Sequence, residues 1–418
     1  MNEVRTAVLE KFLKYVQIWT QSSEGSATAP STECQWDLLN LLKDELTQLG
    51  LEGVEVNEGG VLTAILPSNL GDSGGEAPAI AFIAHVDTYP GTSGKGVKPQ
   101  VVENYDGNDL LLPGSGRYLR VADEPELKQY TGESIVTSDG TTLLGADDKA
   151  GVAEIVTFVE YMLAHPEIKH GPVKVAFTPD EEIGRGTENF PSVDEFAVAA
   201  AYTVDGSKEG EVENETFSAD TATVVITGAD VHPGYAKGKM LNAVRAASHL
   251  ISLLPEESLP ETTEGREGYL HPIAINGDVN EATVPFLVRD FELDGLKSWE
   301  AVLEGLCEQT RQKFPGMKLE TRIEHSYKNM RYYLDKEPRA VEFALEAVRR
   351  VGIEPDLQSI RGGTDGSRLS ELGLPTPNLF AGGRNFHSVN EWVPVVAMEK
   401  AVEVLVELAR LWGDSAAR

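Results

Sequence analysis

The stretch Leu143-Leu144-Gly145-Ala146-Asp147-Asp148-Lys149-Ala150-Gly151 places two adjacent carboxylates between an apolar pair and the start of an apolar helix. Such a run presents carboxylate oxygens at the end of a strand, where they can hold a divalent cation. A helix N-cap accounts for one of the two acids, because Asp is favoured at that position, but it does not account for both. The stretch therefore predicts a cation site whose other ligands come from elsewhere in the chain.

The composition is typical of a globular protein with more than one domain. The chain has 418 residues, which exceeds the size at which a single hydrophobic core stops growing, and 41% of them are apolar. Its net charge of −31 argues against partners that are bound through phosphates, both nucleic acid and anionic membrane surfaces. The charge favours solubility, for example in a salty cytoplasm, and only a few of the acids are expected to bind cations.

The beginning of the chain and its cysteines indicate a cytoplasmic protein. Residues 1–20 mix charged and apolar residues as an amphipathic helix does, which differs from the unbroken apolar centre of a signal peptide. No apolar run is long enough to cross a bilayer. Cys34 and Cys307 are the only cysteines and lie far apart, so a disulfide framework is not expected.

Strand and helix patterns alternate along most of the chain. We expect helices over residues 36–49 and 151–164, and buried strands over residues 61–66, 79–84, 173–178 and 197–204. This alternation predicts an α/β fold with a mostly parallel sheet flanked by helices.

The pattern changes near residue 216. Strands are expected over residues 222–227, 273–275, 283–293 and 318–324, with helices over residues 241–254 and 296–313. We therefore assign residues 1–216 and 330–418 to one domain and residues 217–329 to a smaller α+β domain inserted into it. Insertion is tolerated because domain termini often lie close together.

Two of the remaining acid/His clusters follow predicted strands directly. In His85-Val86-Asp87 the first and third side chains project on the same side of an extended chain, and a nearby carboxylate suits an imidazole that binds metal. In Asp180-Glu181-Glu182 the acids repel one another unless a cation or a proton compensates them. One Glu can bind metal while its neighbour acts as general base. Taken alone, the first cluster is more simply a surface His near a turn, and the second is equally a solvated acidic turn.

Two more clusters, Val204-Asp205-Gly206 and Asn385-Phe386-His387-Ser388, end apolar segments in the same way. Ligands of open α/β folds gather at the carboxyl ends of strands, so five such clusters point to one site. Mixed His, Asp and Glu ligands without cysteine suit zinc, cobalt or manganese in a catalytic centre. The sequence therefore predicts a two-metal hydrolase.

Together the motifs resemble the two-zinc exopeptidase family that contains carboxypeptidase G and succinyl-diaminopimelate desuccinylase, and within it the tripeptide aminopeptidases. The resemblance runs from about residue 37 to the C-terminus. Its family-wide motifs are residues 85–88, 143–151 and 179–184, and those typical of the tripeptide enzymes are residues 231–234, 236–238, 261–265, 289–291, 361–366 and 377–380. The family implies that residues 1–216 and 330–418 form a catalytic di-zinc domain and that residues 217–329 form a lid and dimerisation domain.

The resemblance implies a ligand set for two Zn²⁺ ions, with Co²⁺ or Mn²⁺ as substitutes. Asp147 would bridge the two ions together with a water or hydroxide. One ion would also be bound by His85 and Asp205, and the other by Glu182 and His387.

The resemblance also implies roles for neighbours of these ligands. Asp87 would orient His85, and Glu181 would be the general base that takes a proton from the bridging water and delivers it to the leaving amine. A cis peptide bond is implied between Asp147 and Asp148.

Three residues are implied in substrate binding. His232 would help stabilise the oxyanion of the transition state, although on its own it is more simply a loop His before Pro233. Arg289 and Arg361 would hold the C-terminal carboxylate of the peptide, since a guanidinium binds a carboxylate through two parallel hydrogen bonds. For Arg289 an ion pair with Asp290 is the alternative.

We therefore expect a cytoplasmic metallo-aminopeptidase that releases the N-terminal residue of tripeptides and forms a homodimer if an exposed strand of the inserted domain pairs with a second copy. The alternatives are a related dipeptidase, an amidohydrolase acting on N-acyl amino acids, and a non-catalytic peptide-binding protein. The sequence around His387 and over residues 20–31 departs from the family pattern, which leaves the substrate range open. No carboxylate is assigned to the free amine of the substrate.

Overall fold

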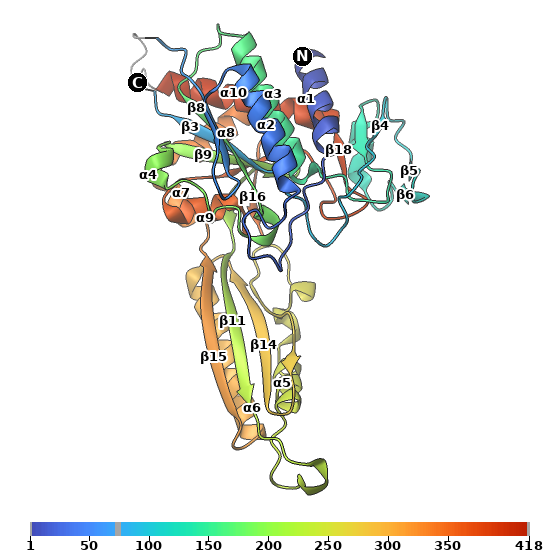
Figure 1. Cartoon of the computed structure of the whole chain (residues 1–418), viewed down its shortest axis with the longest axis vertical. Coiled ribbons are helices and arrows are strands. Elements are labelled where there is room, and N and C mark those ends of the chain that lie inside the picture. Colours follow the sequence, from blue (N-terminus) through green and yellow to red (C-terminus); the bar gives the residue numbers. More distant parts are fainter. Residues whose placement is uncertain (1, 72–76, 416–418) are drawn as a thin grey trace. The chain divides into compact units, whose positions relative to one another are not determined.

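The computed structural model describes residues 2–71 and 77–415 and divides into two compact units (Figure 1). The first unit comprises Met1–Asn214, Tyr333–Gln358 and Thr364–Arg418, and the second comprises Glu215–Tyr332 and Ser359–Gly363. Each unit has its own sheet and its own hydrophobic core.

The first unit is built on an eight-stranded sheet whose central strands are parallel. The strand order is β1 (Glu52–Val56), β2 (Leu62–Leu66), β8 (Val173–Thr178), β3 (Ile80–His85), β9 (Ala200–Gly206), β17 (Asn378–Phe380), β10 (Glu211–Thr216) and β16 (Asp356–Ile360). Strands β8, β3, β9 and β17 pair in parallel, whereas β1 with β2, β2 with β8, and β17 with β10 pair antiparallel. The predicted α/β class is confirmed, with the parallel pairing confined to the buried centre of a mixed sheet.

Helices cover both faces of this sheet because side chains of the central strands alternate between two apolar clusters. Phe82 of β3 contacts Phe158 edge to face at a centroid distance of 5.1 Å, in the core beneath α1, α3 and α10. Its neighbour Ile83 lies in a smaller cluster with Phe196 and Leu369, beneath α4 and α9. The helices are α1 (Asn2–Tyr15), α2 (Gln35–Leu49), α3 (Ala146–Ala164), α4 (Val193–Phe196), α7 (Arg331–Leu334), α8 (Arg339–Arg350), α9 (Asp365–Leu372) and α10 (Val395–Asp414).

Two small sheets lie beside the main one in the first unit, in a stretch for which the sequence pattern predicted no elements. The first has the order β18 (Trp392–Pro394), β7 (Ile135–Thr137) and β4 (Gln100–Val102), and the second pairs β5 (Leu110–Leu112) with β6 (Arg117–Leu119). The pairing of β18 with β7 brings the chain around residue 391 beside the segment that leads into α3.

The second unit is an antiparallel sheet with two helices packed on it (Figure 1). The strand order is β12 (Tyr269–Pro272), β14 (Glu281–Asp290), β11 (Ser218–Thr227) and β15 (Lys318–Tyr327), with β13 (Asn276–Gly277) also paired to β14, and the helices are α5 (Ala243–Ser252) and α6 (Leu293–Lys313). Ala222, Val224 and Ile226 alternate along β11 and are fully buried beneath the helices, as the period of two requires.

One predicted strand of the second unit is wrong. Residues 273–275 lie between β12 and β13 and form no strand of their own. Ile273 and Ile275 are 50% and 45% exposed, so these apolar side chains do not pack into the sheet. The apolar side chains that suggested a buried strand therefore belong to an exposed connection between β12 and β13.

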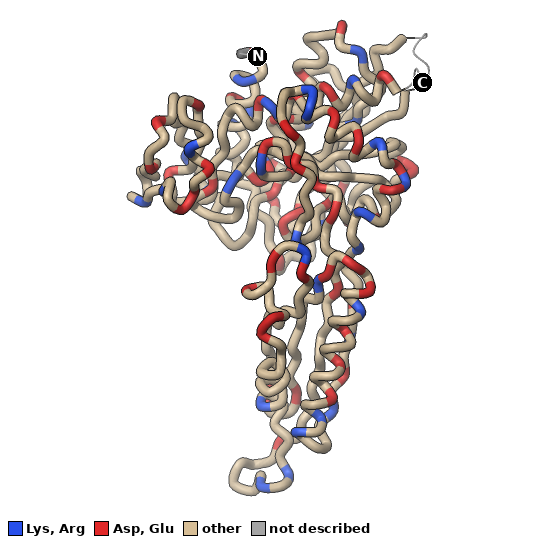
Figure 2. Tube along the Cα trace, turned by 180° about the vertical axis from the view of Figure 1, so that it is seen from behind, with Lys and Arg blue, Asp and Glu red and all other residues tan. Residues whose placement is uncertain are grey.

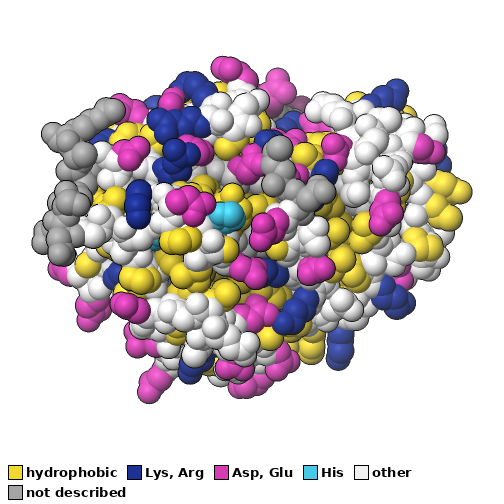
Figure 3. Space-filling view, turned by 90° about the horizontal axis from the view of Figure 1, so that it is seen from above, with side chains coloured by type: hydrophobic (Ala, Val, Ile, Leu, Met, Phe, Trp, Pro, Cys, Tyr) yellow, Lys and Arg dark blue, Asp and Glu magenta, His cyan; other side chains and the backbone are white. Residues whose placement is uncertain are grey.

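Charged side chains are spread over both units. Asp and Glu occur along the whole trace and outnumber Lys and Arg (Figure 2). The face drawn in Figure 3 intermingles acidic, basic and hydrophobic side chains. Among residues 2–71 and 77–415, no helix combines the length and the apolar composition needed to span a bilayer.

Candidate metal centre

The five predicted ligands converge at one edge of the main sheet. His85 ends β3, Asp205 lies near the end of β9, and Glu182 lies in the short 3-10 turn Glu181–Ile183 that follows β8. Asp147 lies in the first turn of α3, and His387 lies in the loop between β17 and β18. Strands β8, β3 and β9 are parallel neighbours, so their carboxyl ends meet at the same edge of the sheet.

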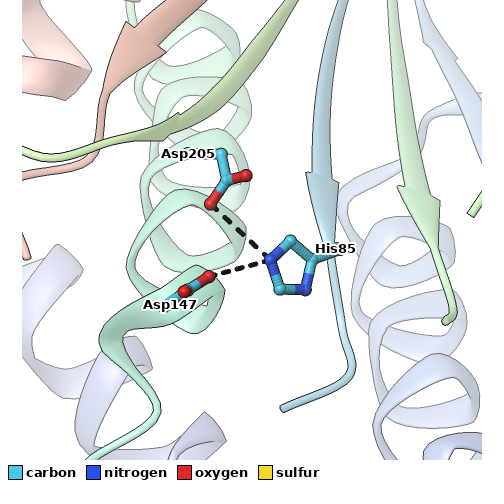
Figure 4. A group of neighbouring side chains, drawn as sticks. All are labelled: His85, Asp147 and Asp205. Atoms are coloured by element: carbon cyan, nitrogen blue, oxygen red, sulfur yellow. Dashed lines mark hydrogen bonds and ion pairs between the residues drawn. The ribbon is translucent and has the colours of Figure 1, made fainter. Parts of the chain in front are cut away.

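Asp147 lies between two imidazole rings. Its Oδ1 is 2.9 Å from Nε2 of His85, and its Oδ2 is 3.1 Å from Nε2 of His387. Asp205 Oδ1 lies 3.6 Å from the same nitrogen of His85, and both carboxylates point toward that ring (Figure 4). Glu182 Oε2 lies 2.9 Å from Nε2 of His387. The five side chains thus form two triads that share Asp147, and within each triad the ligand atoms lie within 4.8 Å of one another.

The buried carboxylate of Asp87 contacts both His85 and the turn that follows β8. Its Oδ1 is 3.3 Å from Nδ1 of His85, and the Asp87 carbonyl is 3.1 Å from the same nitrogen. The same carboxylate accepts hydrogen bonds from the backbone N–H groups of Glu181, at 3.0 Å, and Glu182, at 3.2 Å. Asp87 therefore turns Nε2 of His85 toward the cluster and fixes the backbone of the two glutamates.

Burial and neighbouring charges shift the pKa values of the ligands in this cluster. Burial lowers the pKa of His387, but the carboxylates of Asp147 and Glu182 outweigh it and raise that pKa to about 10. Burial also opposes protonation of His85, yet Asp205 and Asp147 hold its pKa well above the usual range. Burial and the charge of Asp147 raise the pKa of Glu182 to about 8. The cluster therefore favours positive charge, whether from protons or from cations.

Glu181 has the environment of a general base. Burial is the largest cause that raises the pKa of its carboxyl well above the usual range, and Asp365, Asp205 and Glu182 add to it. A carboxylate with a raised pKa accepts a proton readily near neutral pH. Thr178 Oγ1 donates to Asp365 at 2.8 Å and so holds that nearby carboxylate in place.

The donor set fits divalent cations. Glu182 Oε1 is buried and has no hydrogen-bond partner within the described part of the chain, although its partner oxygen contacts His387. A buried carboxylate oxygen without a partner is costly unless a cation binds it. The remaining donors are imidazole nitrogens and carboxylate oxygens, which suit a catalytic zinc, cobalt or manganese centre.

The peptide bond between Asp147 and Asp148 is cis, as predicted. Asp148 is fully buried. Its carboxylate accepts hydrogen bonds from the backbone N–H groups of His85, at 3.2 Å, and Gly151, at 3.1 Å. Asp148 therefore joins the end of β3 to the first turn of α3.

Comparison with known proteins identifies the family. The model of peptidase family M20/M25/M40 matches residues 134–411. The chain belongs to this family. A curated relative from Caldanaerobacter subterraneus subsp. tengcongensis, named Peptidase T, is 49% identical over 407 residues, which cover 97% of this chain and 98% of the relative. The predicted resemblance is thereby confirmed, and the chain is a member of a peptidase family over nearly its full length.

Solved structures share the fold. A tripeptidase from Staphylococcus aureus superposes with a TM-score of 0.77 at 22% identity and covers 98% of each chain. A Bacillus subtilis protein described as a dinuclear metal-binding peptidase of the M20 family superposes with a TM-score of 0.66 at 15% identity, over 98% of this chain and 99% of that one. At these identities the likeness concerns the two-unit fold alone.

The predicted substrate residues all belong to the second unit. His232 is exposed and accepts a hydrogen bond through Nδ1 from the backbone of Gly234, at 3.1 Å. Arg289 donates through Nη1 to the carbonyls of Asp220 and Val288, both at 3.0 Å. Their roles toward a substrate stay predictions.

Arg361 also lies in the second unit, where it binds the backbone. Its Nη1 donates to the carbonyls of Gly265 and Glu267 at 2.8 Å, and its Nη2 donates to Thr263 Oγ1 at 2.9 Å. The guanidinium also lies 5.1 Å from the ring centroid of Phe217. These contacts give Arg361 a structural role inside the second unit.

Sequence reasoning missed the residues that support the site from a distance. Asp180 was noted only as one of three acids, yet it is buried, has a positive φ of 60°, and accepts hydrogen bonds from Ser31 N at 2.7 Å and Gln35 Nε2 at 2.7 Å. It thereby anchors the turn that carries Glu181. Glu391, four residues after His387, was also given no role, and its position directly before an apolar strand was the one available signal.

Proposed function

We propose that this protein is a two-zinc aminopeptidase that releases the N-terminal residue from tripeptides. The observation that carries the proposal is the position of Asp147, each of whose carboxylate oxygens faces a different histidine. The curated relative named Peptidase T supports the substrate class, and the related dinuclear metal-binding peptidase supports the number of ions.

The ligand assignment follows the two triads. Asp147, His85 and Asp205 would hold one zinc ion, and Asp147, Glu182 and His387 would hold the other. Ions bound there would lower the pKa of a water molecule that they share and would polarise the scissile carbonyl. The raised pKa values of His387 and Glu182 describe the metal-free cluster, in which protons compensate the carboxylates.

The carboxylates of Glu181 and Asp87, which lie beside the ligands, would transfer the proton and orient His85. Glu181, whose pKa is raised by burial, would accept the proton of the attacking water and pass it to the amine that leaves. Asp87 would keep the ring of His85 in the orientation that presents Nε2 to the site, and would hold the backbone of Glu181 in place.

Residues of the second unit would bind both the reacting carbonyl and the far end of the peptide. His232 would donate to the oxyanion of the transition state, and Arg289 and Arg361 are the candidates for the C-terminal carboxylate. Fixing both ends of a short peptide would select its length. Because the guanidinium of Arg361 already donates to two backbone carbonyls and to the hydroxyl of Thr263 in the loop of residues 263–267, we favour Arg289 as the group that contacts substrate.

Two further expectations accompany the function. The free cysteines Cys34 and Cys307 fit a reducing compartment such as the cytoplasm. Strand β15 lies at one edge of the second unit's sheet, where pairing with a second copy would form a homodimer.

A panel of di-, tri- and tetrapeptides and N-acyl amino acids, assayed with zinc, cobalt and manganese, tests the proposal. We expect release of the free N-terminal residue from tripeptides, and its loss after chelation. Faster hydrolysis of dipeptides or of N-acyl amino acids than of tripeptides would instead identify the protein as a dipeptidase or an amidohydrolase of the same family. Binding of tripeptides without hydrolysis by the metal-loaded protein would make it a peptide-binding protein.

A further inference from the structure

Glu391 is a fully enclosed carboxylate that is bound by the backbone just before and within the first turn of α3. Its side chain is only 1% exposed. Its Oε2 accepts hydrogen bonds from the N–H groups of Leu144, at 2.7 Å, and Gly145, at 2.8 Å. Its Oε1 accepts a hydrogen bond from the N–H group of Asp147, at 3.0 Å. Both carboxylate oxygens of Glu391 therefore accept hydrogen bonds from one turn of the backbone. Asp147, the last residue of that turn to donate, lies 244 residues before Glu391 in the sequence.

The turn needs an acceptor from outside. The first N–H groups of a helix have no partner within that helix, and successive N–H groups that converge in a turn form a concave anion site. Gly145 adopts a φ of 83°, which makes this convergence possible, and as a glycine it has no side chain that could cap the helix. Asp147 itself has φ and ψ values of −84° and 103°, outside the helical range, and it lies in the first turn, whose N–H groups have no partner within the helix. Glu391 supplies the acceptor that the local sequence lacks.

The same loop carries His387. The base of the loop is closed by backbone hydrogen bonds in both directions between Arg384 and Trp392, at 2.8 Å and 3.1 Å. His387 and Glu391 lie inside this closed loop, and Trp392 begins β18. One loop therefore presents an imidazole to a carboxylate oxygen of Asp147 and a carboxylate to the backbone of the same residue.

We propose that Glu391 is a positioning residue that fixes the backbone of Asp147 and thereby holds its carboxylate between His85 and His387. The inference rests on the proposed function, because it takes these three side chains to be the ligands of two metal ions. It goes beyond that function by assigning the geometry of the bridging ligand to a residue that binds neither metal nor substrate. A change at Glu391 is expected to alter metal binding without removing any ligand.

Glu391→Gln is the informative substitution. The amide keeps the size of the side chain but replaces one acceptor by a donor, which must face an N–H group of the turn. Glu391→Asp keeps the charge and withdraws it by one methylene. Glu399→Gln is the matched control, because Glu399 is also an acid with little exposure, 8%. Glu399 lies on α10 and its Oε2 is 3.5 Å from Nε of Arg5 on α1.

Cobalt titration of the metal-free proteins gives the first measurement. We expect Glu391→Gln to bind at least one Co²⁺ ion about 10- to 100-fold more weakly than the wild type, as is typical when a group that orients a metal ligand is lost. Its visible d–d absorption should change, Glu391→Asp should recover part of the affinity, and Glu399→Gln should keep the wild-type affinity and spectrum. A Glu391→Gln protein with lowered thermal stability but wild-type affinity and spectrum would reduce Glu391 to a purely structural role and overturn the proposal.

Amide hydrogen exchange of the metal-free protein gives a measurement that needs neither metal nor activity. We expect faster exchange at Leu144, Gly145 and Asp147 in Glu391→Gln, with the rest of α3 unchanged. Unchanged exchange at these amides would overturn the proposal. A wild-type protein that binds two Co²⁺ ions but cleaves no tripeptide would remove the proposed function and leave this inference standing, whereas a wild type that binds no divalent ion would overturn both.

Discussion

The ring of Tyr89 stacks on the imidazole of His387, with centroids 4.1 Å apart and planes inclined by 4°. Thr92 Oγ1 donates to the carbonyl of His387 at 2.7 Å. Among the five predicted ligands His387 has the most exposed side chain, at 43%, so it is the one least held by its surroundings. The loop that follows His85 and Asp87 therefore supports the exposed ligand of the opposite triad.

Removing the stacked ring should loosen the metal ion bound by His387. A stacked aromatic pair contributes about 0.5–1.5 kcal/mol, so Tyr89→Ala is expected to speed the loss of one zinc ion to a chelator by about 2- to 10-fold. Tyr89→Phe keeps the ring and serves as the control, with a rate equal to that of the wild type. Equal rates for Tyr89→Ala and the wild type would show that stacking does not retain the ion.

Glu181→Gln should separate binding from chemistry. The amide cannot accept the proton of the attacking water, so kcat for tripeptides should fall by about 10²- to 10⁴-fold. Zinc content should stay at the wild-type level because Glu181 is not a member of either triad. Hydrolysis at the wild-type rate would remove Glu181 from the role of general base, and loss of zinc would instead make it a ligand.

The metal-free protein should lose stability as the pH rises. The pKa of His387 is raised to about 10, so its stabilising contribution is complete below the unfolded value near 6.5 and is lost as the pH approaches 10. The pKa of Glu182 is raised to about 8, so its contribution is complete below about 4.5 and is lost in the same direction.

Zinc bound to the two triads, as proposed, would replace the protons and remove this dependence. The difference in Tm between zinc-loaded and zinc-free protein is therefore expected to widen from pH 6 to pH 9, as differential scanning calorimetry would measure. His387→Gln, which lacks one titrating group, should reduce the slope of the zinc-free protein. A constant difference across this range would contradict the protonated state assigned to the empty cluster.

Arg361 and Arg289 should behave differently when each is changed to Lys. Lys cannot reproduce the three hydrogen bonds that Arg361 makes to the loop of residues 263–267, so Arg361→Lys should lower the free energy of unfolding by about 1–3 kcal/mol. Arg289→Lys should chiefly raise the KM for tripeptides, because a single ammonium cannot form two parallel bonds to a carboxylate. Chemical denaturation and steady-state kinetics measure the two effects, and a reversed pattern would exchange the two roles.

The ligands could be predicted from the sequence because each one follows an apolar strand or precedes an apolar helix. His85, Asp205 and Glu182 end or follow parallel neighbours, so local patterns alone bring them to one edge. The supporting contacts could not be predicted in this way. Tyr89 and His387, or Glu391 and Asp147, are far apart in the sequence, and nothing in either local pattern indicates the partner.

Local patterns also misplaced some element boundaries. Helix α3 begins at Ala146, ahead of the start at Gly151 that the apolar pattern predicts, although the non-helical φ and ψ values of Asp147 and Asp148 break its first turn. Residues 273–275 were expected to form a strand because they are apolar, and the structure leaves Ile273 and Ile275 exposed. Burial depends on the neighbours that the fold supplies, which a single segment does not reveal.

The contacts of Asp87 have a consequence for redesign of this enzyme. One carboxylate holds the ring of His85 and also the backbone of Glu181 and Glu182. A substitution meant to change the choice of metal at this position would therefore also shift the base, and selection for either property would act on both.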